Sequence, residues 1–317
     1  MQAATTRGFG PMSRLIIENT DIPVIRPNDV LVEVKASSVN PKDWKLNVPF
    51  FSWIPKNLRP SNTWVLGDDL AGIIVEKGSM VKQFEVGDEV YGMSMNFRTG
   101  SCAEFAAISH DCIAQKPVNL RYAEAASVPL AGLTALQALS LGNVNEYSNI
   151  LIIGASGGVG TFAVQIAKAM GAYVTGVCSG KNSDLVLSLG ADEVIDYTKR
   201  SFIDEEHDFD VVIDATSFES LFSCSSILKE DGIYVTTAGF AHSILTFFAA
   251  KYRPGKQRSK KTWVNSNTKD LEKLRYYLES GQVVPVLDSE YSLSEISKSY
   301  ARSKTGRAVG KIVINIK

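Results

Sequence analysis

The chain has 317 residues, which is long enough for two domains, and a formal net charge of −1, which excludes bulk electrostatic attraction to nucleic acid or a membrane. Its 45% hydrophobic and 21% charged residues are typical of a soluble globular enzyme. Its four cysteines form no Cys-x-x-Cys pair and its three histidines lie far apart, which argues against a disulfide framework and a zinc site.

Nothing in the sequence predicts a membrane segment or a secretory signal. No apolar stretch approaches about 18 residues, and the N-terminal residues lack the apolar core of a signal peptide. Cys178 lies in an expected buried strand and Cys224 in an expected helix, a pattern that favours a reducing compartment. We therefore expect a cytoplasmic protein.

Residues 1 to about 120 are rich in short strand patterns. Residues 30–35 alternate apolar and polar side chains, and residues 72–76 and 88–91 form short apolar runs between glycine-rich turns. Regularly spaced short strands of this kind are typical of a compact β-barrel-like domain.

The pattern changes near residue 120. Residues 124–141 have helical periodicity, and from residue 149 strands and helices alternate, which predicts a parallel sheet with helices on both faces. The final segment, residues 308–316, returns to strand character, and we place it in the first domain. Beyond the first strand at 150–153, the expected strands are 173–178, 193–195, 210–214 and 232–237, and the expected helices are 182–189, 219–228 and 270–280.

The glycine-rich turn at residues 154–160 follows a strand and precedes an amphipathic segment, which is the context of a dinucleotide-binding fingerprint. Gly157 lets the backbone approach a pyrophosphate, and Gly160 lets the helix pack closely on the strand. The free amides and positive end of the helix then hold the phosphates. An ordinary strand-to-helix turn is the alternative. The residues assigned to cofactor binding are Ser156, Gly157, Gly158 and Val159.

The end of the second expected strand indicates which nicotinamide cofactor binds. An NAD site usually has an acid about 20 residues beyond the glycines, but here no acid follows that strand until Asp184. Ser179 and Lys181 instead offer a hydroxyl and a cation, which suit the 2′-phosphate of NADPH. The alternative is that Lys181 is an ordinary surface lysine.

Seven segments occur in one order along the chain, at residues 40–45, 67–72, 86–92, 125–139, 154–160, 189–197 and 305–313. Together they resemble the zinc-free branch of the medium-chain dehydrogenase/reductase superfamily, nearest to its NADPH-dependent quinone and enone oxidoreductases. The resemblance implies an α/β protein with a GroES-like β-barrel catalytic domain, residues 1–122 and 281–317. It also implies a Rossmann NADPH-binding domain with a doubly wound parallel sheet, residues 123–280, and a homodimer.

The same resemblance implies further site residues. Tyr197 joins Ser179 and Lys181 around the 2′-phosphate, and Thr134 lies near the nicotinamide. The loop after the fifth strand of the parallel sheet contributes Ala238, Gly239 and Phe240. Asn40 and Lys45 face the reacting end of the cofactor.

Departures from zinc-dependent relatives indicate a metal-free site. Those relatives carry a cysteine at the position of Asn40 and a Gly-His-Glu motif where this chain has Gly-Asp-Asp at residues 67–69. Because zinc would polarise an alcohol or carbonyl oxygen, its missing ligands argue against alcohol oxidation. We interpret Asp68 as a buried hydrogen-bonding residue.

We hypothesise hydride transfer from NADPH to a quinone or to the β-carbon of an α,β-unsaturated carbonyl. Asn40 and Lys45 are the candidate donors to the developing oxyanion, and no proton donor is identified. The aromatic-rich residues 47–65 form either a wall of an apolar substrate pocket or a loop packed on protein.

The basic run at residues 251–261 has six cations in eleven residues, and we interpret it as a solvated loop. Peripheral contact with an anionic membrane and RNA binding are its alternatives, although no nucleic-acid partner is expected. Two other functions stay open. One is a cofactor-binding structural or RNA-binding protein of the ζ-crystallin type, and the other is a trans-acting enoyl reductase.

Overall fold

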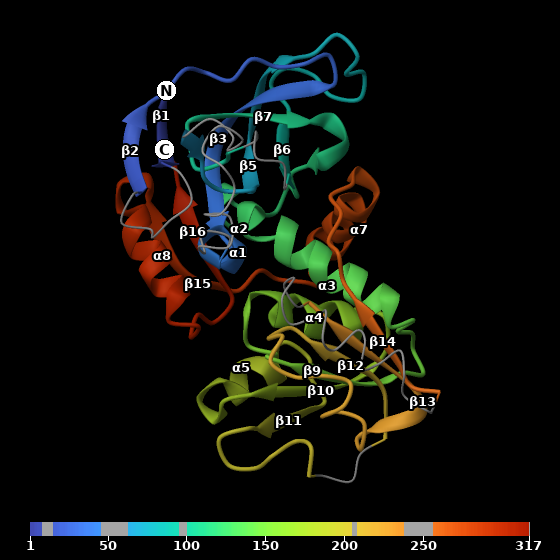
Figure 1. Cartoon of the computed structure of the whole chain (residues 1–317). Helices are drawn as coiled ribbons and strands as arrows, with labels where there is room; N and C mark the ends of the chain where they lie inside the picture. The colour runs from blue at the N-terminus through green and yellow to red at the C-terminus, as the bar shows by residue number, and fades with distance from the viewer. Residues whose placement is uncertain (8–14, 46–62, 95–99, 205–207, 238–255, 317) are drawn as a thin grey trace, which may run out of the picture. The chain divides into compact units, whose positions relative to one another are not determined.

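Figure 1 shows the computed structural model of the chain. It describes residues 1–7, 15–45, 63–94, 100–204, 208–237 and 256–316. Within these ranges no helix is both long enough and apolar enough to cross a membrane.

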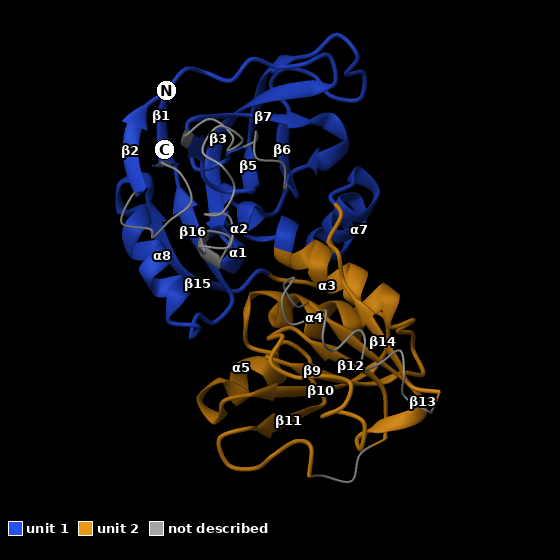
Figure 2. Cartoon of the chain, viewed as in Figure 1, with its two compact units in different colours: residues 1–130, 266–279, 285–317 blue, residues 131–265, 280–284 orange. Residues whose placement is uncertain are grey.

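The chain forms two compact units (Figure 2). Unit 1 comprises Met1–Leu130, Ser266–Glu279 and Pro285–Lys317, and unit 2 comprises Ala131–Asn265 and Ser280–Val284. The limits expected from the sequence, after residues 122 and 280, differ from these in one main respect. Helix α7 (Thr268–Glu279) belongs to unit 1, because the Tyr91 hydroxyl donates to the Leu271 carbonyl and the Thr268 hydroxyl donates to the Ile113 carbonyl.

Unit 1 is built on a mainly antiparallel sheet in the order β15-β16-β3-β5-β6-β8, with β7 also paired to β3. A smaller sheet has the order β2-β1-β4. The strands of the large sheet are β3 (Asp29–Val39), β5 (Asp69–Lys77), β6 (Glu89–Met93), β7 (Phe105–Ser109), β8 (Ile113–Gln115), β15 (Leu287–Ser292) and β16 (Lys311–Asn315). Those of the small sheet are β1 (Gln2–Arg7), β2 (Leu15–Asn19) and β4 (Thr63–Val65).

The core of unit 1 and the position of its C-terminal strand follow the sequence pattern. Val30, Val32 and Val34 alternate along β3 and enter one core cluster, as expected for β-branched residues on one face of a pleated strand. The C-terminal strand β16 returns to pair antiparallel with β3 and belongs to unit 1. The helices of unit 1 are α1 (Pro41–Lys45), α2 (Tyr122–Ser127), α7 and α8 (Ile296–Lys304).

Unit 2 contains a parallel sheet of six strands in the order β11-β10-β9-β12-β13-β14. In order of appearance this is 3-2-1-4-5-6, a doubly wound arrangement of the kind that the family resemblance implies. The strands are β9 (Asn149–Ile153), β10 (Tyr173–Cys178), β11 (Glu193–Asp196), β12 (Phe209–Asp214), β13 (Leu228–Thr236) and β14 (Arg258–Lys261). The helices among its described residues are α4 (Gly158–Ala169), α5 (Ser183–Ser188) and most of α3 (Pro129–Leu141).

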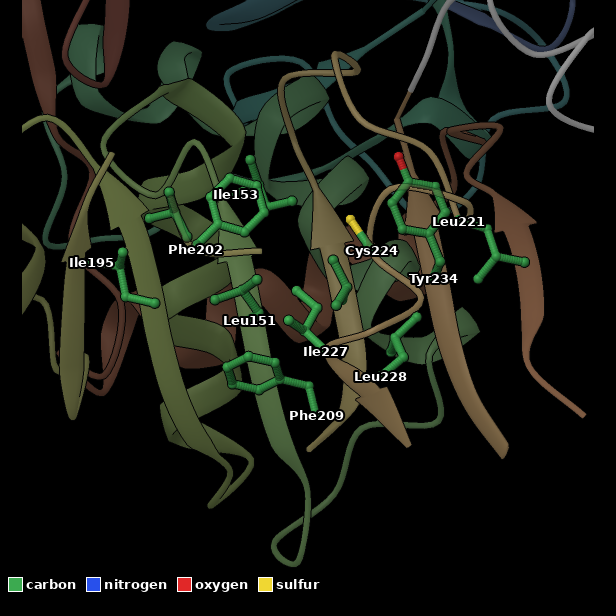
Figure 3. Packing of buried hydrophobic residues seen from close by; sticks show 12 residues of the cluster. Leu151, Ile153, Ile195, Phe202, Phe209, Leu221, Cys224, Ile227, Leu228 and Tyr234 are labelled. Carbon is green, nitrogen blue, oxygen red and sulfur yellow. The ribbon is translucent and has the colours of Figure 1, made fainter. Parts of the chain in front are cut away.

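One face of this sheet is covered by a turn-rich segment and not by the helix predicted at residues 219–228. Residues 221–227 form turns, and β13 already begins at Leu228. The Ser223 hydroxyl donates to the Ser220 carbonyl, and the Ser220 amide donates to the Ser223 hydroxyl, so serine side chains compete with the helical backbone bonds here. Leu221 and Cys224 still pack on the sheet core (Figure 3). The apolar spacing therefore predicted which side chains are buried, but the serine bonds favour turns over the predicted helix.

Two other predicted elements differ from the structure. The helix expected at residues 124–141 is split into α2 and α3 at Pro129, which has no amide hydrogen to continue the bonds of α2 and is the first residue of α3. Part of the basic run is the edge strand β14 and not a loop. There the Lys260 ammonium donates to the Leu141 carbonyl, and the Lys261 ammonium lies 3.8 Å from the centre of the Trp263 ring.

Candidate functional site

The turn between β9 and α4 has the close packing that a dinucleotide fingerprint requires. Gly160 is buried, and a Cβ there would overlap the Gly154 carbonyl oxygen and lie 2.7 Å from the Cα of Ala155. Only glycine therefore lets the first turn of α4 approach the end of β9 so closely. Gly157 is the N-cap residue of α4, with an extended backbone and φ of −82°.

The start of α4 suits an anionic group. Among the described residues no side chain caps this helix of twelve residues, and residues 156–159 are half-buried. Its first amides and the positive end of its dipole are therefore available to an acceptor from outside the chain. The residues assigned to cofactor binding here, Ser156, Gly157, Gly158 and Val159, thus fit the diphosphate of a dinucleotide.

The predicted 2′-phosphate residues lie at neighbouring strand ends in unit 2. Cys178 of β10 pairs with Asp196 of β11, so Ser179 and Lys181 follow one strand while Tyr197 follows the other. Lys181 and Tyr197 are exposed, and Ser179 is half-buried. The side-chain Nδ2 of Asn182 donates to the Ser156 hydroxyl at 3.0 Å, which connects this region to the glycine turn.

Asp196 is a carboxylate that the sequence reasoning missed at this edge. Its Oδ1 accepts from the Gly180 amide at 2.8 Å, the Thr198 amide at 3.0 Å and the Thr198 hydroxyl at 2.7 Å. The Thr198 hydroxyl, followed by these amides, lowers the pKa of Asp196 and favours its ionised form. The β10–β11 pairing was the signal that would have found it.

The remaining predicted cofactor residues differ in what the structure says of them. Thr134 is buried on α3. Ala238, Gly239 and Phe240 lie outside the described residues. The assignment of these four residues to the nicotinamide end therefore stays a prediction.

Unit 1 contains a buried polar cluster formed by Ser38, Asn40, Asp69 and Lys311. Asn40 directly follows β3, while Asp69 and Lys311 are the first residues of β5 and β16. Because β5 and β16 both run antiparallel to β3, their first residues meet at its end. Residues up to 271 positions apart in the sequence are thus brought into contact.

The hydrogen bonds of this buried polar cluster fix the orientation of the Asn40 amide. Its Oδ1 accepts from the Lys311 ammonium at 2.6 Å, and its Nδ2 donates to Asp69 at 2.8 Å. Asp69 also accepts from the Ser38 hydroxyl at 2.5 Å, the Leu130 amide at 2.8 Å and Lys311 at 3.3 Å. A flipped amide would set Oδ1 against a carboxylate, so the orientation is fixed. Among the described residues Asp69 is the one acceptor bonded to Nδ2, which carries a second hydrogen.

Two further carboxyl groups lie beside this cluster. Asp43 accepts from the backbone N–H of Asn40 at 2.9 Å and from the Tyr300 hydroxyl at 3.4 Å, and Asp68 pairs with Lys42. Burial, with repulsion from Asp68, raises the pKa of Asp43 to about 7. Burial also raises the pKa of Asp68 to about 6, although Lys42 opposes this rise.

The structure describes charged groups near Asn40 that the sequence analysis did not name. Lys45 is the last residue of α1, but its side chain lies outside the described residues. Lys311, which bonds to Asn40, and Lys42 of α1, which pairs with Asp68, are cations that the structure describes here and that the sequence reasoning missed. In the described part of the chain, no group of three or more His, Cys, Asp or Glu residues is placed to hold a metal ion.

The raised carboxyl pKa values predict a pH-dependent stability. The folded protein holds a proton on Asp43 up to about pH 7, whereas an unfolded aspartic acid has a pKa near 3.8. The resulting stabilisation is complete below the unfolded value and is lost as pH rises through about 7. We expect Asp43→Asn to reduce the fall in unfolding free energy between about pH 5 and pH 8, a fall of at most about 1.4 kcal/mol per pH unit for one proton.

Urea unfolding of the two proteins across this pH range measures the difference in slope. Asp68, Asp69, Lys42 and Tyr300 also face Asp43, so the Asn variant keeps some pH dependence from Asp68. Parallel curves for the two proteins would show that Asp43 does not titrate in this range.

Comparisons with known proteins identify the fold and its family. Residues 26–138 match the alcohol dehydrogenase GroES-like domain, and residues 189–314 match the zinc-binding dehydrogenase family. The chain is 36% identical over 326 residues to a 2-methylene-furan-3-one reductase of Solanum lycopersicum, across 99% of this chain and 79% of that one. The chain belongs to the medium-chain dehydrogenase/reductase superfamily.

Its position in the medium-chain dehydrogenase/reductase superfamily is among quinone and alkenal oxidoreductases. The chain is 34% identical over 325 residues to an NADPH-dependent alkenal/one oxidoreductase of Arabidopsis thaliana, with 99% and 79% coverage. The solved quinone oxidoreductase of Coxiella burnetii is 31% identical, covers 100% of this chain and 99% of its own, and has a TM-score of 0.90. These similarities confirm the predicted GroES-like and Rossmann fold, and they show an NAD(P)H-dependent type of oxidoreductase.

Proposed function

We propose that this protein is an NADPH-dependent, zinc-independent reductase of quinones or of the C=C bond of α,β-unsaturated carbonyls. The observation that carries the proposal is the Asn40 side-chain amide, whose orientation is fixed by Asp69 and Lys311 and whose Nδ2 bonds to one acceptor, Asp69, among the described residues. An amide oriented in advance can stabilise an oxyanion without rearranging during the reaction. The names of the relatives support the substrate class, because each names a quinone, an enone or an alkenal.

The charges beside Asn40 support the zinc-independent assignment. Lys42 pairs with Asp68, and Lys311 pairs with Asp69, so an ammonium group already neutralises each carboxylate. A divalent ion bound to these oxygens would have to displace or repel those two cations. This donor set is therefore a poor one for zinc.

The residues of this chain have separate roles in the proposed reaction. Bound NADPH supplies a hydride to the β-carbon of the substrate or to the quinone. The residues at the start of α4 bind the diphosphate, while Ser179, Lys181 and Tyr197 bind the 2′-phosphate. Asn40, with Lys45, donates hydrogen bonds to the oxygen that becomes negative. Thr134, Ala238, Gly239 and Phe240 are proposed to border the nicotinamide.

The alternative functions have less support. Lys260 and Lys261 of the basic run are bound to a carbonyl and an aromatic ring, which leaves fewer cations for RNA or a membrane surface. No described feature favours a carrier-protein substrate for a trans-acting enoyl reductase. The homodimer and the cytoplasmic location stay predictions, and the Arabidopsis relative is named as chloroplastic.

A substrate panel tests the proposed function. We expect NADPH to be oxidised with quinones, alkenals or enones, and Asn40→Ala to lower kcat/KM by about 100-fold or more, as for loss of an oxyanion donor. Asn315→Ala is the matched control, because the Asn315 side chain donates to Glu290 and lies at the far end of β16 from Lys311. Absence of turnover with the whole panel, or equal kcat/KM values for the two variants, would contradict the proposal.

A further inference from the structure

The turn after β10 is held in place by a carboxylate from the neighbouring strand. Gly180 lies between Ser179 and Lys181, and its amide donates to Asp196 Oδ1 at 2.8 Å. A Cβ on residue 180 would overlap Asp196 Oδ2 and lie 3.0 Å from its Cγ. Glycine at this position and the aspartate that occupies the freed space therefore form one packed unit.

The same carboxylate also shapes the backbone around Tyr197. Asp196 Oδ1 accepts from both the amide and the hydroxyl of Thr198, which closes a turn across Tyr197. The Tyr197 amide donates to the Cys178 carbonyl at 3.2 Å, and its side chain is 59% exposed. Asp196 thus braces the backbone at each of the three proposed 2′-phosphate residues.

Asp196 itself is not available to a ribose hydroxyl. Three donors of its own chain bind Oδ1, and Oδ2 is shielded from solvent against Gly180, with the Lys199 ammonium 3.7 Å away. It therefore differs from the acid of an NAD site, whose free oxygens accept from the ribose. Asp196 can therefore affect cofactor binding by positioning the backbone at Gly180 and Thr198.

We propose that Asp196, packed against Gly180, is a positioning residue that sets the preference for NADPH over NADH. The inference rests on the proposed assignment of Ser179, Lys181 and Tyr197 to the 2′-phosphate. Because these residues come from two loops, their donors converge on one phosphate only if the loops keep a fixed separation. Asp196 provides that separation through its bonds to both loops.

The test is the ratio of the Kd for NADH to the Kd for NADPH, measured by direct titration. We expect Asp196→Ala to lower this ratio at least tenfold, because the Kd for NADPH rises while the Kd for NADH changes little. Asp196→Asn keeps an oxygen that can accept from Gly180 and Thr198, so its ratio should lie nearer that of the natural protein. If Asp196 acted only through its charge, both variants would instead bind NADPH more tightly, which would overturn the proposal.

Two further variants separate positioning from general loosening of the sheet. Asp192 accepts from the Val174 amide at the opposite ends of β10 and β11, so it is also a carboxylate bonded to the backbone of the neighbouring strand. Asp192→Ala is therefore the matched control, and it should leave the ratio of Kd values unchanged. Gly180→Ala should lower the ratio, and should add little to Asp196→Ala because the overlapping carboxylate is then gone. An equal ratio in Asp192→Ala and Asp196→Ala would contradict the inference.

The natural protein distinguishes failure of the inference from failure of the proposed function. If it binds NADPH no better than NADH, the assignment of the 2′-phosphate residues is wrong. In that case the positioning role is retained only if Asp196→Ala raises the Kd for NADPH and Asp192→Ala does not. Any other result also rejects the positioning role. If the natural protein prefers NADPH and Asp196→Ala keeps that preference, only the inference fails.

Discussion

Replacing Lys311 by methionine is expected to lower the free energy of unfolding by about 3–5 kcal/mol, the typical cost of leaving a buried ionised partner without its counter-charge. Asp69 is fully buried, and Lys311 is the cation that bonds both to it and to Asn40. Methionine fills a similar volume, so most of the loss should come from charge and hydrogen bonding. Urea unfolding followed by circular dichroism measures the change.

Two further proteins control this experiment. Lys298→Met removes an exposed lysine of α8 that pairs with Glu295, the residue before this helix. It should change stability little because water screens that pair. The double variant Lys311→Met with Asp69→Asn should recover part of the loss, because the residue left in the cluster is then neutral. A Lys311→Met protein as stable as Lys298→Met would show that the buried polar cluster does not need its cation.

Replacing Gly160 by alanine is expected to damage both the fold of unit 2 and cofactor binding. The added methyl group would overlap the Gly154 carbonyl, and no flexible side chain there can move aside. We expect the free energy of unfolding to fall by about 1–3 kcal/mol, as for other overpacked sites. We also expect the Kd for NADPH to rise at least about tenfold, or about 1.4 kcal/mol. Thermal unfolding and fluorescence titration measure the two effects.

Gly157→Ala separates these two effects. A Cβ at residue 157 would meet only the Gly154 carbonyl oxygen at 3.3 Å, and a φ of −82° is ordinary for alanine. This variant should therefore keep most of its stability while its methyl group obstructs the approach of a diphosphate to the start of α4. A Gly160→Ala protein with the thermal stability of the natural one, or a Gly157→Ala protein with unchanged NADPH affinity, would contradict this account of the turn.

Local features of this chain could be predicted from sequence, because a few neighbouring residues determine them. The strand, turn and helix at residues 149–170 depend on adjacent apolar residues and glycines, and the structure confirms them. The helix predicted at residues 219–228 was wrong because serine side chains bond to the backbone there. The strand β14 was missed because its lysines suggested a solvated loop, whereas the edge of a parallel sheet accommodates them.

Contacts made through the sheets could not be predicted in the same way. Asn40 was singled out as a possible donor, but its bonds to Asp69 and Lys311 depend on the order and direction of strands far apart in sequence. Asp196 was overlooked for a related reason, since the search for an acid followed one strand and not its neighbour. Lys42 and Lys45 share one short helix, and sequence alone did not indicate which lies beside Asp68.

Transfer of deuterium from NADPH labelled at C4 to an enone tests the central claim most directly. The account predicts that mass spectrometry and NMR of the product find one deuterium on the β-carbon when the label occupies the transferred position. The Asn40→Ala protein should place the label on the same carbon but much more slowly. NADPH consumption with no deuterium in the product, or reduction of the carbonyl to an alcohol with the C=C bond intact, would contradict enone C=C reduction by this site.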